Sequence, residues 1–87
     1  MRRLVSSGFL RKYKKLTKKN PRLAKILDNR FDLFSLNPHN PSLKLHKLSG
    51  KHTEQWSITI AANLRVIFQY INDGILVTDI GSHDEVY

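Results

Sequence analysis

The spacing of apolar residues changes once along this chain, from a helical period to a period of two. In the first part, Phe9, Tyr13 and Leu16 recur at i, i+4 and i+7, which is typical of the buried stripe of a helix. The change falls at residues 37–41 (Asn-Pro-His-Asn-Pro), a composition typical of a loop. Beyond it, the alternation of residues is that of strands. Helices followed by most of a sheet predict an α+β domain.

The first part of the chain predicts a short strand and two helices. Residues 2–6 form the strand, and Ser6 or Ser7 is expected to cap a helix over about residues 8–18. Asn20 and Pro21 indicate where the next helix begins, with Asn as its cap and Pro in its first turn. This helix continues to about residue 35, with apolar residues at helical spacing that are Leu23, Ile26, Leu27, Phe31 and Phe34.

The remainder predicts four strands, at about residues 43–48, 55–60, 64–71 and 75–80. Asn72-Asp73-Gly74 is typical of a hairpin turn between the last two, and residues 83–87 are expected to form a tail. The predicted order is β-α-α-β-β-β-β in one domain over residues 1–87. We expect two antiparallel helices packed on one face of a mostly antiparallel sheet.

The basic residues are concentrated in the predicted helices. The net charge is +8, with eleven Lys and Arg against Asp28 alone in residues 1–30, and four against six acidic residues in residues 31–87. Such a one-sided charge favours a polyanion or an acidic protein as partner. A solvated basic helix face explains the charge equally well, so both interpretations stay open at this point.

Several classes of protein are excluded by what the sequence lacks. It has no cysteine, so neither a disulfide framework nor a thiolate metal site is possible. The four histidines show no i, i+4 pair or other ligand spacing, so we expect neither a metal site nor a cofactor. The chain has no apolar stretch that approaches a membrane span and no signal-peptide pattern, so the expected compartment is the cytoplasm.

Arg65 lies in a stretch that is apolar on both faces and is therefore expected to be a central strand. A cation there is costly unless it meets an anion, either a carboxylate or the phosphate of a ligand. Asp79 and Glu54 are the carboxylates that would make it a structural ion pair.

Four segments in this order and spacing resemble the RelE/ParE superfamily of bacterial toxins, over nearly the whole chain. They are residues 45–50 (Leu-His-Lys-Leu-Ser-Gly), 56–58 (Trp-Ser-Ile), 65–68 (Arg-Val-Ile-Phe) and 81–87 (Gly-Ser-His-Asp-Glu-Val-Tyr). The resemblance implies the RelE-like fold and the toxin of a type II toxin–antitoxin pair. In the ribonuclease branch, the toxin enters the ribosomal 30S A site and cleaves messenger RNA without a metal. An acidic cognate antitoxin holds it inactive, and operator DNA is bound only through the toxin–antitoxin complex.

Cleavage of RNA without a metal uses its own 2′-hydroxyl, which attacks the adjacent phosphate. This requires a base for the hydroxyl, a cation for the developing charge and an acid for the leaving oxygen. DNA lacks the attacking hydroxyl, so such a site selects RNA.

The resemblance implies roles for three residues. His83 is expected to be the general acid or base, because imidazole titrates near neutral pH; the alternative is an exposed histidine in a tail. Arg65 matches the arginine that holds the scissile phosphate, a task suited to a planar fork. Tyr87 matches an aromatic residue that stacks on a base or donates a proton, and as a chain end it is alternatively frayed.

Further residues have weaker matches. His46 corresponds to a catalytic histidine in one branch, or is a half-buried strand histidine with a satisfied hydrogen bond. Lys47 and Lys51 are expected to bind the RNA backbone, as are Lys12, Lys15 and Lys19 of the first helix, which we expect to face ribosomal RNA. One branch has a further histidine where this chain has Thr59. No described set of catalytic residues is reproduced whole, so the assignment of acid and base stays open.

Two other functions remain as alternatives. One is a non-enzymatic toxin like the branch of the superfamily that inhibits DNA gyrase, which would not need a histidine and an arginine in one site. The other is a basic nucleic-acid-binding module without toxicity, whose binding would fall steeply with salt.

Overall fold

The computed structural model describes residues 1–49 and 54–86. In chain order its elements are β1 (Arg2–Val5), α1 (Ser7–Lys19), α2 (Leu23–Leu36), the short 3₁₀ helix η1 (Pro41–Leu43), β2 (His46–Lys47), β3 (Trp56–Ala61), β4 (Leu64–Ile71), β5 (Gly74–Ser82) and α3 (His83–Val86). In this part of the chain no helix has the length and apolar character that crossing a membrane requires.

The strands form one sheet in the order β1-β5-β4-β3-β2. β1 pairs with β5 in parallel, and the other neighbours are antiparallel. The sheet is therefore mostly antiparallel, and β4 is its central strand, as predicted.

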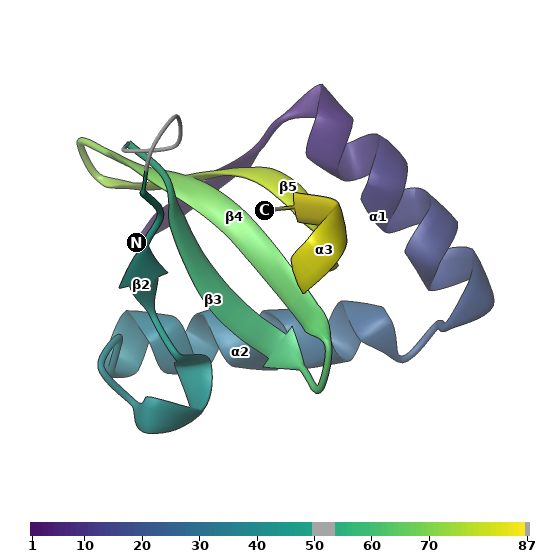
Figure 1. Ribbon diagram of the computed structural model, residues 1–87, viewed down its shortest axis with the longest axis horizontal. Coiled ribbons are helices and arrows are strands. Elements are labelled where there is room, and N and C mark those ends of the chain that lie inside the picture. The colour runs from purple at the N-terminus through teal and green to yellow at the C-terminus, as the bar shows by residue number, and fades with distance from the viewer. Residues whose placement is uncertain (50–53, 87) are drawn as a thin grey trace.

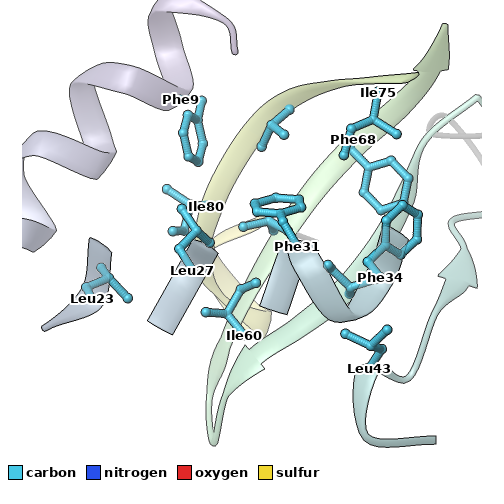
Figure 2. Close-up of a cluster of buried hydrophobic side chains, with 13 residues drawn as sticks. Phe9, Leu23, Leu27, Phe31, Phe34, Leu43, Ile60, Phe68, Ile75 and Ile80 are labelled. Atoms are coloured by element: carbon cyan, nitrogen blue, oxygen red, sulfur yellow. The ribbon is translucent and has the colours of Figure 1, made fainter. Parts of the chain in front are cut away.

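Both long helices pack on the same face of this sheet (Figure 1). Phe9 of α1 and four residues of α2 meet side chains from β3, β4 and β5 in one core cluster (Figure 2). The α2 residues are Leu23, Leu27, Phe31 and Phe34, all from the apolar pattern that predicted the helix. The predicted fold class is confirmed.

The first turns of the two helices differ in how they are capped. Ser6 caps α1, because its Oγ accepts a hydrogen bond from the Phe9 amide at 3.0 Å, as expected. The prediction that Asn20 caps the second helix was wrong. Residues 21–22 form a turn, and Arg22 is the cap residue of α2 without a side-chain hydrogen bond.

Strand β2 is shorter than the predicted strand at residues 43–48. Asn40 accepts a hydrogen bond from the Ser42 amide and begins η1, with Pro41 in its first turn. Lys44 then takes a left-handed conformation with φ 49°, which interrupts the extended backbone of a regular strand. Two residues of the predicted strand remain in β2.

Residues 83–86 are a short helix rather than the predicted tail. The Ser82 amide donates to Glu85 Oε1 at 2.8 Å, and the Glu85 amide donates to Ser82 Oγ at 3.3 Å. This reciprocal pair is a capping box, which satisfies two amides at the start of a helix. It turns the chain sharply from β5 into α3.

Candidate functional site

Two of the predicted site residues, His46 and Arg65, lie on the face of the sheet away from α1 and α2. Directly opposite residues on antiparallel strands share a face, and two cross-strand rows follow from the register. The rows are His46–Ser57–Ile67–Asp79 and Thr59–Arg65–Gly81. We call this face the open face because neither long helix packs on it, although Ser57, Ile67 and Gly81 are buried. The intervening residues Ile58, Val66 and Ile80 belong to the core on the other face.

Arg65 is half-buried on the central strand β4 and lies between the other candidates. Among the described residues no carboxylate lies within ion-pairing distance of it, so neither Asp79 nor Glu54 forms the structural pair considered above. Asp79 is bound instead to Lys12, with Nζ 2.7 Å from Oδ1. Arg65 Nη1 is shielded from solvent and has no hydrogen-bond partner in the described structure.

Gly81 brings α3 onto the open face beside Arg65. A β-carbon at Gly81 would lie 3.1 Å from Val86 Cγ1 and 3.2 Å from Glu85 Cβ, both tighter than ordinary contact. The absence of a side chain at this position therefore lets α3 pack closely on β5. In Figure 1, α3 lies in front of the sheet and α2 behind it.

His83 is the first residue of α3, two positions after Gly81. Its side chain is 58% exposed, and Nδ1 lies 3.6 Å from Asp84 Oδ1. The predicted proton-transfer residue is thus accessible to solvent and held by a capped turn at the open face.

The Glu85 carboxylate accepts a hydrogen bond in the capping box, a role that was not predicted from the sequence. Its pKa is lowered chiefly by the hydrogen bond from the Ser82 amide, then by the Ser82 side chain, and also by the nearby positive charge of Lys12. The spacing Ser-x-x-Glu at residues 82–85 is a known signal of a helix start. A carboxylate engaged in this way is not free to accept a proton from a substrate.

His46 and Lys47 of the edge strand β2 point to opposite faces. His46 lies opposite Ser57 on the open face, is exposed, and places Nδ1 2.9 Å from Lys44 O. Lys47 lies opposite Trp56, which packs against the core on the helix side. Lys47 therefore does not share the face of Arg65. Tyr87 and Lys51 lie outside the described residues.

Two lysines of α1 lie beside the end of β5 and the helix α3. Lys12 and Lys15 line a hollow of about 190 Å³ together with Gly81 and Glu85. Lys19 is exposed in the last turn of the same helix. Within residues 1–49 and 54–86, no three His, Asp or Glu side chains are grouped so that they could hold a metal ion.

Two helices on one face of a mostly antiparallel sheet are the fold of RelE-like toxins. Its sequence matches, over residues 2–87, the family described as the bacterial toxin of type II toxin–antitoxin systems, YafQ. The chain belongs to this family.

Solved toxins share the whole fold at low sequence identity. A copper-bound mutant toxin from Helicobacter pylori is 18% identical with a TM-score of 0.85, covering 100% of this chain and 99% of that one. YafQ from E. coli is 17% identical with a TM-score of 0.78, covering 99% and 97%. The E. coli complex of YafQ with DinJ, described as a toxin–antitoxin complex, gives a TM-score of 0.77 at 17% identity, covering 99% and 96%.

One curated relative is more similar over a short stretch. Endoribonuclease HigB from Proteus vulgaris is 55% identical over 29 residues, which are 33% of this chain and 32% of that protein. The match thus spans about a third of the relative's length.

Proposed function

We propose that this toxin is an endoribonuclease that cleaves messenger RNA on the ribosome in the cytoplasm, by attack of the RNA 2′-hydroxyl and without a metal ion. The observation that carries the proposal is Arg65. It is a half-buried cation on the central strand, with no carboxylate beside it in the described residues and one nitrogen without a partner. A cation in that state requires an anion, and RNA supplies a phosphate.

The roles follow from what each group offers. The Arg65 guanidinium binds the scissile phosphate and stabilises the charge that develops there. His83 transfers a proton, since it is exposed at the start of α3. His46 on β2 is the candidate for the second proton transfer, and Tyr87 for stacking on a base. The order of acid and base between the two histidines is left open.

The partners follow from the charge and from the relatives. Lys12, Lys15 and Lys19 present positive charge from α1, which suits ribosomal RNA around the A site. The family description names toxin–antitoxin systems, and one relative is bound to DinJ. We infer that an acidic antitoxin holds this chain inactive and that operator DNA is bound only through their complex.

The test is toeprinting of a model message in a purified bacterial translation system. We expect new ends within the A-site codon with the wild-type protein, and a loss of at least a hundredfold in their rate with Arg65→Ala or His83→Ala. Proton transfer contributes about 10²–10⁴-fold in general, and a donor to the developing charge about 10²–10³-fold. His39→Ala is the matched control, because His39 is an exposed histidine in a loop outside the open face.

An intact message with the wild-type protein would contradict the nuclease function. Inhibition of DNA supercoiling by gyrase in a parallel assay would then identify the non-enzymatic class of toxin.

A further inference from the structure

Two shielded polar atoms on the open face have no hydrogen-bond partner. They are Arg65 Nη1 and Thr59 Oγ1, and within the part of the chain that the structure describes no other shielded side-chain nitrogen or oxygen is in this state. An unpaired buried polar group costs folding free energy, because its hydrogen bonds to water are lost without replacement. Such an atom in a folded protein therefore calls for a ligand or another explanation.

The two atoms belong to neighbouring side chains. Thr59 and Arg65 are direct partners in the register of β3 and β4, so their side chains leave the same face of the sheet. In such pairs the β-carbons lie about 4.5–5.5 Å apart. A hydroxyl and a guanidinium can both donate a hydrogen bond. The pair can therefore offer two donors to one anion.

The backbone around the pair is well held. Arg30 Nε donates to Thr59 O at 3.2 Å from α2 on the other face. The strand register shifts between Thr59 and Ala61, an irregularity of the kind that redirects a side chain next to a site. The third residue of the row is Gly81, which has no side chain and is covered by Val86 and Glu85 of α3.

We propose that Thr59 and Arg65 together bind one phosphate of the RNA substrate, with the Thr59 hydroxyl donating to an oxygen of the phosphate that Arg65 holds. This inference rests on the proposed nuclease function and adds a residue that binds the phosphate directly. Both residues are only partly buried as wholes, so the phosphate reaches them through rotation of their side chains. The position that one branch of the superfamily fills with histidine thus carries a hydroxyl for binding here.

The test compares Thr59→Val with Thr59→Ser. Valine keeps the branched shape and removes the hydroxyl, whereas serine keeps the hydroxyl. The probe is a single-stranded RNA with 2′-O-methyl groups, which binds but lacks the attacking hydroxyl. We expect Thr59→Val to weaken its binding about tenfold, as for a hydrogen bond to a charged group, and Thr59→Ser to stay within about twofold.

Thermal unfolding separates binding from stability. Because valine removes an unpaired hydroxyl, we expect the midpoint of Thr59→Val to stay equal or to rise while binding falls. In an Arg65→Ala background, Thr59→Val should have no further effect on binding, since both groups act on one phosphate. The proposal would be overturned if Thr59→Val bound RNA as the wild type does, or if its effect added to that of Arg65→Ala. It would also be overturned if the unfolding midpoint and the binding fell together in Thr59→Val and in Thr59→Ser.

Inorganic phosphate distinguishes failure of this inference from failure of the proposed function. If the wild-type protein leaves messages intact, titration with phosphate still reports on the pair through the amide NMR signals of Thr59 and Arg65. Shifts that disappear in Thr59→Val support the anion site whatever the reaction. Signals that do not move overturn it.

Discussion

Arg30 joins β3 to the segment before β2 through one side chain. Its Nε donates to Thr59 O at 3.2 Å, Nη2 donates to Ser42 O at 2.7 Å, and Nη1 donates to Ser42 Oγ at 3.3 Å. All three acceptors are neutral oxygens that only the folded chain brings together. Sequence reasoning singled out Arg65 because a cation in an apolar strand is conspicuous, and it missed Arg30 because its partners lie far away along the chain.

We expect Arg30→Ala to lower the free energy of unfolding by about 2 kcal/mol, within the general range for hydrogen bonds from a charged donor. Arg30→Lys should recover little of this loss, because one ammonium cannot replace a planar fork. Denaturant unfolding measures both values. Lys25→Ala, an exposed residue of the same helix, is the control. If Arg30→Lys were as stable as the wild type, the planar guanidinium would not be needed to join these segments.

At the scale of elements, the capping box makes α3 sensitive to acid. The pKa of Glu85 lies below its ordinary value of 4.5, chiefly because the Ser82 amide donates to the carboxylate. A group with a lowered pKa stabilises the folded state above its unfolded pKa and loses that contribution as the pH falls through its folded pKa. We expect the protection of the Ser82 and Glu85 amides, measured as the exchange rate relative to the intrinsic rate at the same pH, to fall below about pH 4.5.

Glu85→Gln isolates this effect, because glutamine also fits the capping box but does not titrate in this range. The variant should not show the loss of amide protection at acid pH that the wild type shows at α3. Equal pH dependence in the two proteins would assign the effect to another carboxylate.

The elements could be predicted where their periodicity is long. Phe9, Tyr13 and Leu16 locate α1, and the alternating residues of β4 locate the central strand. The strand predicted at residues 43–48 was too long, because neither the alternation of residues nor their strand propensity reveals the left-handed conformation of Lys44. Four residues are too few for a helical period, so α3 was recognisable only by its capping signal.

The candidate site was predictable in its residues and not in its arrangement. His46, Arg65 and His83 follow from residue types and from the resemblance, but the pairing of Thr59 with Arg65 depends on the register of strands. The same holds for Lys47, whose place on the opposite face from His46 follows from a two-residue strand.

At the scale of the whole molecule, the positive charge is concentrated in residues 1–30, which include α1. Lys15 and Lys19 lie on the side of α1 that carries Lys12, whereas Lys14 and Lys18 lie on another side of the same helix. Lys12 is bound to Asp79, so replacing it by Glu would place two carboxylates together. The structure therefore favours Lys15 and Lys19 for testing contact with ribosomal RNA.

We expect Lys15→Glu with Lys19→Glu to weaken ribosome binding about tenfold or more and to reduce the slope of log K against log salt by about 0.7–0.9 for each lost phosphate contact. The control is Lys14→Glu with Lys18→Glu, which makes the same change of charge on exposed residues. Sedimentation with ribosomes over a range of salt concentrations measures both. Equal losses in the two double variants would mean that only total charge matters.

The parallel pairing of β1 with β5 can form only after nearly the whole chain has been translated. Arg2 pairs with Gly74, where a β-carbon would overlap the Arg2 carbonyl oxygen, so this contact requires glycine at the start of β5. β1 is translated first and has no neighbour until β5 has been made. A nascent chain interrupted before β5 lacks the strand that joins β1 to β4, and it has no α3.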